Sequence, residues 1–115
     1  IDIAHKLIEK TNLEREKLKK ENPQYELKLI SKNEIKLYIP HQANGKILDY
    51  IEEKEDPEKM GKIYRNIERY GNMSSATIPV ALVEAIEEKK LLKKDLTILT
   101  DVGSGLALGG ALIRI

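Results

Sequence analysis

The sequence predicts an α/β fold, a three-layer α-β-α arrangement in which helices cover a mixed sheet. Two observations carry this prediction. Short apolar runs that suit buried strands alternate along the chain with apolar stripes at helical spacing, and no repeat interrupts them. The 115 residues are also enough for one domain with a real core. We expect the order helix, strand, helix, strand, helix, strand, loop, strand.

The composition is that of a soluble globular protein. Hydrophobic residues make up 41% and charged residues 34%, and the formal net charge of +1 lacks the positive excess of a nucleic-acid-binding protein. The chain contains no cysteine, which excludes a disulfide, a thiolate metal site and a cysteine nucleophile within these residues. No apolar stretch reaches the roughly 20 residues that span a bilayer, and no signal peptide opens the chain. We therefore expect a cytoplasmic protein without membrane or nucleic-acid partners.

The first residues predict a helix that is followed by a charged segment. An apolar stripe at helical spacing covers residues 3–8, and we expect residues 11–12 to end the helix. Charges of both signs dominate residues 14–21, which we interpret as a solvated excursion. Asn22-Pro23 then excludes a helix, because the residue before proline avoids the α region. Since the chain opens with isoleucine inside an apolar pattern, we expect it to be part of a longer protein.

Two alternating segments predict strands before the middle of the chain. Apolar and charged residues alternate over residues 25–29, and residues 31–34 could turn that strand back onto residues 35–39. In the second strand Ile35, Leu37 and Ile39 are expected on one face. Because Pro40 has no N–H, pairing is expected to stop there. His41 would then stand at the strand tip, where ligands gather in open α/β sheets.

The next elements are a helix, a short turn and a strand. Asn44 is expected to cap a helix whose apolar residues fall at helical spacing over residues 47–51. An Asp-Pro-Glu sequence predicts a helical turn over residues 56–61. The short apolar run over residues 63–67 predicts a buried strand.

The last third of the chain predicts one helix and two strands. Ser74, Ser75 and Thr77 are candidate caps for a helix that has Pro79 in its first turn and runs to about Lys89. Strands are expected over residues 96–100 and 106–115, with a glycine-rich loop at residues 103–105 between them. The glycine pair at residues 109–110 is expected to mark a bulge or the close approach of a backbone or ligand.

Three polar loops are expected at one end of the sheet, and they carry His41, Asn72 and the glycine-rich segment at residues 103–105. An imidazole both donates and accepts, an amide adds an uncharged donor, and a glycine-rich turn can direct N–H groups at an oxyanion. Such a set suits acyl chemistry. A histidine that serves only as a satisfied turn residue accounts for the same pattern, so the residues alone leave both interpretations open.

Four motifs follow one another at residues 39–44 (IPHQAN), 69–76 (RYGNMSSA), 78–82 (IPVAL) and 103–105 with 109–114 (GSG and GGALIR). In this order they resemble the C-terminal half of a 3-oxoacyl-acyl carrier protein (ACP) synthase III, a thiolase-like condensing enzyme. The resemblance covers residues 35–115 and implies a thiolase-like half fold. It also implies that residues 1–34 are a first helix with an atypical charged insertion, and that the N-terminal half of the enzyme is absent from this chain.

The resemblance implies a Cys-His-Asn site whose cysteine, in the N-terminal half, takes an acyl group from coenzyme A. His41 and Asn72 would be the other two members, which assist decarboxylation of a malonyl thioester and stabilise its enolate. The backbone N–H of Ser104 would complete the oxyanion hole. Asn44 aligns with an asparagine that contacts the pantetheine arm, and Lys46 with a basic residue that attracts the acidic carrier protein. A helix cap and a solvated lysine are the plainer interpretations of these two residues.

The implied activity is acyltransfer: condensation of an acyl-CoA starter with malonyl-ACP in fatty acid or polyketide-like biosynthesis, without a cofactor or metal. The implied partners are the N-terminal half and ACP, with a homodimer of the full-length enzyme. The isolated chain should be inactive, because it has no nucleophile. A non-catalytic thiolase-like partner subunit and a hydroxymethylglutaryl-CoA synthase are the alternatives. Met73 and Ser104 stand where the family often has threonine and glycine, and the link at residues 12–34 is longer than usual.

Overall fold

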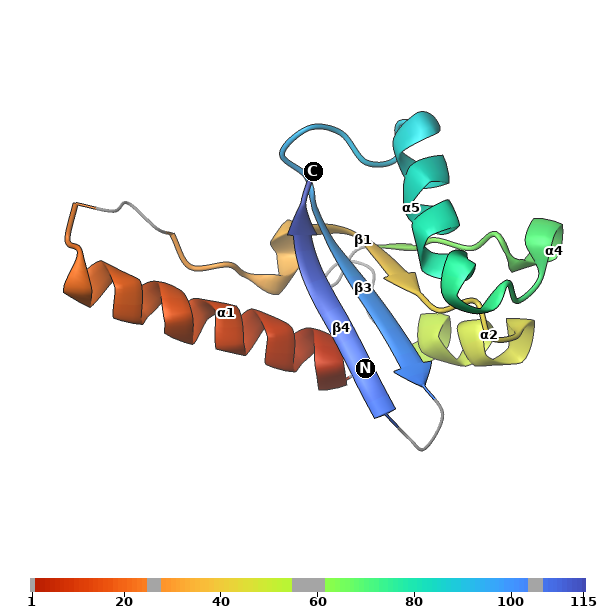
Figure 1. Cartoon of the computed structure of the whole chain (residues 1–115), viewed down its shortest axis with the longest axis horizontal. Coiled ribbons are helices and arrows are strands. Elements are labelled where there is room, and N and C mark those ends of the chain that lie inside the picture. Colours follow the sequence, from red (N-terminus) through yellow and green to blue (C-terminus); the bar gives the residue numbers. More distant parts are fainter. Residues whose placement is uncertain (1, 25–27, 55–61, 104–106) are drawn as a thin grey trace.

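The fold is built around a mixed sheet (Figure 1). The computed structural model describes residues 2–24, 28–54, 62–103 and 107–115. Among these residues the strands lie in the order β2-β1-β3-β4. β1 is parallel to β2 and β3, whereas β3 and β4 are antiparallel, so the predicted mixed sheet is confirmed. The strands are β1 (Ile35–Pro40), β2 (Lys62–Ile63), β3 (Leu96–Gly103) and β4 (Ala107–Arg114).

Helices cover both faces of the sheet, which confirms the predicted three layers. Ile8 of α1 packs on one face, and Ala81 and Ala85 of α5 pack on the other. Figure 1 shows α1 and α5 on separate sides of the sheet, with α2 and α4 beyond the arrowhead of β1. The helices are α1 (Asp2–Glu21), η1 (Lys32–Glu34), α2 (Gly45–Lys54), α4 (Ile67–Tyr70), η2 (Ser74–Ala76) and α5 (Thr77–Glu87).

Both faces of β1 are buried, because each faces its own hydrophobic cluster. Burying one such aliphatic side chain contributes about 1.5–3 kcal/mol. The cluster under α1 contains Ile8, Ile30, Ile35, Tyr38, Leu96 and Ile98. The cluster under α5 contains Leu37, Ile39, Tyr64, Ala81, Ala85 and Leu91.

β1 contains a register shift that the sequence pattern did not reveal. Ile35 pairs with Leu96 and Leu37 pairs with Thr97, so Lys36 is an extra residue in this ladder. An extra residue changes which face the following side chains point to. The expectation that Ile35 shares a face with Leu37 and Ile39 is therefore wrong, and Ile35 packs under α1 instead.

The first helix is longer than predicted, because Asn12 does not end it. The Asn12 side chain donates to the Ile30 carbonyl at 2.8 Å and accepts the Ile30 N–H at 2.7 Å, as a neighbouring strand would. The charged residues 14–21 are exposed as expected, apart from the half-buried Arg15, but they continue the helix. Glu, Arg, Lys and Leu all favour helix, so nothing stops α1 before Asn22-Pro23.

The carboxyl end of β1 lies where the sequence predicts it. Pro40 still occupies a position opposite Thr100, and the His41 N–H donates to the Thr100 carbonyl at 2.8 Å. Pairing with β3 ends there, as expected for a strand that reaches a proline. His41 therefore stands at the carboxyl edge of the parallel part of the sheet.

The prediction of a strand over residues 63–67 is wrong in length, because the observed strand is much shorter. β2 covers only Lys62–Ile63, the Tyr64 N–H adds one further bond to the Tyr38 carbonyl, and α4 already begins at Ile67. The physical reason is the Gln42 side chain, which binds the Tyr64 carbonyl and the Asn66 N–H. These backbone groups are therefore unavailable for a longer strand pairing.

The predicted helix near residue 79 is confirmed, but its caps are not. α5 begins at Thr77, its N-cap is Ala76, and no side-chain hydrogen bond caps it. The Thr77 hydroxyl instead accepts the Met73 N–H at 3.1 Å. Ser74 is the first residue of the 3₁₀ turn η2, which leads into the helix.

The C-terminal strands form a more regular hairpin than predicted, in which β3 is longer and β4 (Ala107–Arg114) slightly shorter than expected. β3 extends to Gly103, and Gly109 and Gly110 pair in unbroken register with Asp101 and Thr100. The pairs that the structure describes between β3 and β4 contain no bulge, and a Cβ added at Gly109 would meet nothing within 4 Å. Residues 28–30 form no strand, while residues 25–27, the turn expected at residues 56–61 and residues 104–106 lie outside the described residues.

Candidate functional site

His41 is held at the strand tip by its backbone. Its N–H binds Thr100 of β3, and its carbonyl accepts the Ala43 N–H at 3.0 Å. The side chain is only 17% exposed. Two strands therefore fix its Cα, and the ring lies against the carboxyl edge of β3.

The His41 ring presents an unsatisfied nitrogen to the protein interior. Nδ1 is buried and has no hydrogen-bond partner among the described residues. The nearest carboxylate oxygen, Oδ1 of Asp101, lies 3.8 Å away. That distance exceeds hydrogen-bond length, but it is within ion-pair range for a protonated ring.

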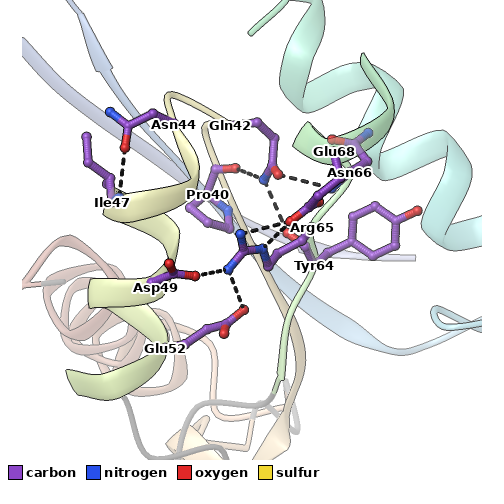
Figure 2. A network of polar contacts seen from close by, with 10 residues as sticks. All are labelled: Pro40, Gln42, Asn44, Ile47, Asp49, Glu52, Tyr64, Arg65, Asn66 and Glu68. Atoms are coloured by element: carbon purple, nitrogen blue, oxygen red, sulfur yellow. Dashed lines mark hydrogen bonds and ion pairs between the residues drawn. The ribbon is translucent and has the colours of Figure 1, made fainter. Parts of the chain in front are cut away.

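Asn44 caps α2, as the sequence predicts. Its side-chain oxygen accepts the Ile47 N–H at 2.9 Å (Figure 2). Since the oxygen must face this donor, the amide NH₂ points away from the helix end. Lys46, in the first turn of the same helix, is exposed and forms no ion pair with another described residue.

Asn72 is exposed in the turn between α4 and η2. Its side-chain oxygen accepts the Ser74 N–H at 2.9 Å, which is an Asx-type turn. This bond fixes the amide orientation and leaves the NH₂ as a donor for another group. The preceding Gly71 has φ +66°, a backbone angle that favours glycine.

No hydrogen bond joins His41 to Asn72 within the described part of the chain, but Gln42 connects their loops. The Gln42 side chain is fully buried. Its NH₂ donates to the Pro40 carbonyl at 2.8 Å and to the Tyr64 carbonyl at 3.2 Å, while its oxygen accepts the Asn66 N–H at 3.1 Å. Figure 2 shows this amide between the end of β1 and the segment before α4.

A polar network extends from Asn66 to α5 and anchors α4. The Asn66 amide donates to Glu84 at 2.8 Å, and Arg69 and Tyr70 donate to the other oxygen of Glu84 at 2.9 and 3.2 Å. The hydrogen bond from Asn66, followed by that from Arg69, lowers the pKa of the Glu84 carboxyl. Because α4 ends at Tyr70, two residues before Asn72, this network positions the Asn72 turn.

A second set of charges joins α2 to α4. Arg65 contacts Asp49 at 2.5 Å, Glu52 at 3.5 Å and Glu68 at 2.8 Å (Figure 2). The hydrogen bond to Asp49 is the main cause of the raised pKa of the Arg65 guanidinium. A pair this exposed contributes little stability. These contacts matter for geometry instead, because they hold α2, which Asn44 caps, beside α4, which precedes Asn72.

The chain matches the model described as 3-Oxoacyl-[acyl-carrier-protein (ACP)] synthase III C terminal over residues 26–115. The chain belongs to this family.

Individual synthase III proteins support the assignment. The beta-ketoacyl-[acyl-carrier-protein] synthase III of Aquifex aeolicus (strain VF5) is 45% identical over 85 residues, which are 74% of this chain and 27% of that protein. The protein of that name from Clostridium botulinum (strain Loch Maree / Type A3) is 47% identical over 81 residues, 70% of this chain and 24% of that protein. The chain thus spans about a quarter of the length of these relatives.

Solved structures of synthase III share the fold. The crystal structure of 3-oxoacyl-[acyl-carrier-protein] synthase III from Aquifex aeolicus VF5 matches with a TM-score of 0.65 and 43% identity, over 75% of this chain and 28% of that one. The synthase III structure from Thermus thermophilus matches with a TM-score of 0.62 and 36% identity, over 71% and 25%. The resemblance and the thiolase-like α/β fold predicted from the sequence are confirmed.

Three further expectations for this synthase III domain concern Ser104, a metal site and membrane-spanning helices. Ser104 lies outside the described residues. Within those residues, no group of three His, Cys, Asp or Glu side chains is placed to hold a metal ion. Among the helices that the structure describes, none combines the length and the apolar character needed to cross a membrane.

The residues that connect the candidate site residues were not predicted from the sequence. Gln42 lies inside the IPHQAN motif, where no local pattern marks it as a buried amide, and Glu84 is a charge that interrupts the apolar stripe of α5. A carboxylate on a helix face that packs against the protein is a signal for a buried partner, here Asn66. Asp101 directly follows a predicted strand, but its place beside His41 depends on the register between β1 and β3, which no local pattern determines.

One cavity of the synthase III domain lies away from the candidate residues. Its volume is about 570 Å³, and it lies beside the edge strand β2 and the end of α5. His41, Asn44, Lys46 and Asn72 do not line it. Five cationic residues do: Lys36, Lys62, Arg65, Lys89 and Lys90.

Proposed function

We propose that this chain supplies the C-terminal catalytic half of a 3-oxoacyl-ACP synthase III, an acyltransferase that condenses an acyl-CoA starter with malonyl-ACP by decarboxylative Claisen condensation in fatty acid biosynthesis. One observation carries the proposal: a chain of this family holds both His41 and Asn72, in loops that Gln42 and Asn66 tie together. A purely structural partner subunit has no chemical need for either side chain.

His41 and Asn72 act on the malonyl group. When the malonyl carboxylate leaves as CO₂, the electron pair of the broken carbon–carbon bond becomes a thioester enolate. Two preorganised donors stabilise that negative charge, and one such donor is worth about 2.7–4 kcal/mol in oxyanion holes. The bond from Ser74 supports this role for Asn72, since it turns the amide NH₂ outward.

The other residues bind the substrates. The Ser104 backbone N–H is proposed as a donor to the acyl oxygen of the cysteine-bound intermediate. The outward amide of Asn44 is proposed to contact the pantetheine arm, which its capping bond leaves possible. Lys46, exposed on α2, is proposed to attract the acidic carrier protein. No metal or organic cofactor takes part in the proposed reaction.

The nucleophile comes from another part of the enzyme, because this chain contains no cysteine. The N-terminal half of the same enzyme is proposed to dock on α5, where Val83 and Ile86 are 53% and 41% exposed. Large apolar side chains that recur on one helix favour a protein contact. A homodimer of the full-length enzyme and a cytoplasmic setting stay predictions.

The decisive experiment separates the two half-reactions in an enzyme that carries this chain as its C-terminal part. His41→Ala and Asn72→Ala should each lower malonyl-ACP decarboxylation and condensation about a hundredfold, since 1.36 kcal/mol corresponds to tenfold. Transfer of the acyl group to the cysteine should change little. The double variant should lose less than the sum, because both donors serve one charge.

Asn22→Ala, just beyond the end of α1, is the control and should leave both half-reactions unchanged. Equal loss of acyl transfer and decarboxylation would show that the two residues act through the nucleophile. Full activity of His41→Ala would make His41 a turn residue and support a non-catalytic role. Condensation by the purified chain alone would contradict the proposed division of the site.

A further inference from the structure

The cavity of about 570 Å³ beside β2 combines a partly apolar wall with a concentration of positive charge. Its volume falls in the range of small-molecule sites, about 300–1,000 Å³. Leu37, Ile63 and Tyr64 form the apolar and aromatic part of the wall, and the other five lining residues are lysines or arginine. The whole chain has a net charge of only +1, so this local excess of cations does not follow from the composition.

Two of the five cations are already paired, and three are not. Arg65 contacts carboxylates of α2 and α4, and Lys90 lies 3.3 Å from a carboxylate oxygen of Glu88 and 5.0 Å from the ring centre of Tyr64. The remaining three form no ion pair with another described residue: Lys36, Lys62 and Lys89. Unpaired charges of one sign in a concave site with apolar walls raise the local concentration of the opposite ion.

The position of Lys36 in the cavity wall depends on an irregularity of the backbone. Lys36 is the extra residue at the register shift of β1, and it is exposed while every other residue of that strand is buried. Lys62 of the edge strand β2 is paired with Leu37, directly beside this position. Bulges occur often next to functional sites, because they redirect a side chain.

Lys89 also depends on an irregular backbone. It follows the C-cap of α5, and its φ of 61° is a left-handed angle that favours glycine. The Lys90 N–H donates to the Ala85 carbonyl at 2.9 Å, and the Lys89 N–H donates to the Ile86 carbonyl at 3.1 Å, as in helix ends where glycine prevails. Strained backbone of this kind is found most often where a side chain has a function.

We propose that this cavity binds a small molecule that carries two or more phosphate groups, whose charges Lys36, Lys62 and Lys89 neutralise. A lysine ammonium binds phosphate oxygens as a point charge with several donors, and three unpaired ammonium groups match a compact polyanion. The concave wall fits a small molecule better than the surface of an acidic protein. None of the residues proposed for the condensation lines this cavity, so the inference does not rest on the proposed function.

Inorganic pyrophosphate is the probe for this site, and calorimetric titration of the chain at low ionic strength is the measurement. One molecule should bind per chain, and amide NMR signals of residues 62–65 and 89–90 should shift, whereas those of His41 and Asn72 should not. Lys36→Ala and Lys62→Ala should each weaken binding about tenfold, as expected for loss of a hydrogen bond between charged groups. Lys10→Ala makes the same charge change on the exposed surface of α1 and should alter the affinity by less than about twofold.

Lys89→Gly separates a role in binding from a role in the fold. It should weaken pyrophosphate binding about tenfold and at the same time raise the thermal unfolding midpoint, because glycine adopts this φ without strain. A lysine that serves only the fold would not combine a loss of affinity with a gain of stability.

Three results would overturn the proposal: no saturable binding of pyrophosphate, equal weakening by Lys10→Ala and Lys36→Ala, or unchanged affinity in Lys89→Gly. The first would exclude the site, the second would show unspecific attraction to a basic chain, and the third would remove the strained lysine from it. If acyl carrier protein bound instead of pyrophosphate and Lys36→Ala weakened that binding, the surface would be a protein contact and the small-molecule proposal would fail. Loss of pyrophosphate binding would leave the proposed condensation untouched, because different residues carry it.

Discussion

The side-chain oxygen of Gln42 accepts the backbone N–H of Asn66 at 3.1 Å across 24 positions of sequence. This bond joins the residue after His41 to the residue that precedes α4, and α4 leads directly to the Asn72 turn. The two candidate catalytic side chains come from separate loops. The buried amide of Gln42 therefore helps to fix their relative position.

Gln42→Ala should lower the free energy of unfolding by about 3 kcal/mol, because it leaves the Pro40 and Tyr64 carbonyls and the Asn66 N–H unpaired in the interior. Urea denaturation measures this change, and amide exchange at Asn66 should become faster. Gln24→Ala is the matched control, since Gln24 is exposed and should change stability by less than about 0.5 kcal/mol. Equal effects of the two substitutions would contradict the structural role of Gln42.

Gly71→Ala should destabilise the chain by about 1–3 kcal/mol. Gly71 has φ +66° and ψ −162°, a region that is almost closed to residues with a Cβ. The strain falls directly before Asn72, so the turn should loosen as well. Gly109→Ala is the control in the same assay, because its Cβ would meet nothing within 4 Å. Similar unfolding midpoints for the two variants would exclude backbone strain at Gly71.

Glu84 should make stability sensitive to acid. Its pKa is lowered in the folded chain, first by the hydrogen bond from Asn66. The stability that this contributes is present above the usual glutamate pKa of about 4.3, and it is lost as the pH falls from there through the lowered value.

Glu84→Gln should therefore reduce stability at neutral pH and flatten its decline in acid, as thermal unfolding between about pH 6 and 2 would measure. Glu87→Gln is the control on the same helix, because Glu87 is exposed and forms no ion pair with a described residue. An equally steep acid decline in Glu84→Gln and in the unsubstituted chain would remove Glu84 from the explanation.

The isolated chain should self-associate through α5. Val83 and Ile86 are exposed on this helix, so the chain lacks whatever covers them in the proposed enzyme. Sedimentation velocity should show association that rises with concentration and that Val83→Lys reduces. Leu18→Lys, at the exposed end of α1, should not reduce it. A chain that stays monomeric over a wide concentration range would count against this surface.

The sequence predicted those features that depend on a few adjacent residues. The end of β1 at Pro40 and the cap at Asn44 follow from one backbone N–H and one side chain, and both are confirmed. Asn12 shows the opposite case, since the asparagine that was expected to end a helix instead binds Ile30. The same holds for Gln42, whose partners come from a segment that no local pattern connects to it.

The extra residue at Lys36 has a consequence for how this protein can vary. Upstream of it, Ile35 faces α1, whereas Leu37 and Ile39 face α5. Because a bulge adds one residue, the alternation of side chains in the segment before it is independent of the alternation in the strand that ends at Pro40, next to His41. Residues could therefore be gained or lost between α1 and β1 without rotating the histidine to the opposite side of the sheet. The bulge at Lys36 therefore permits the segment before β1 to vary in length during evolution.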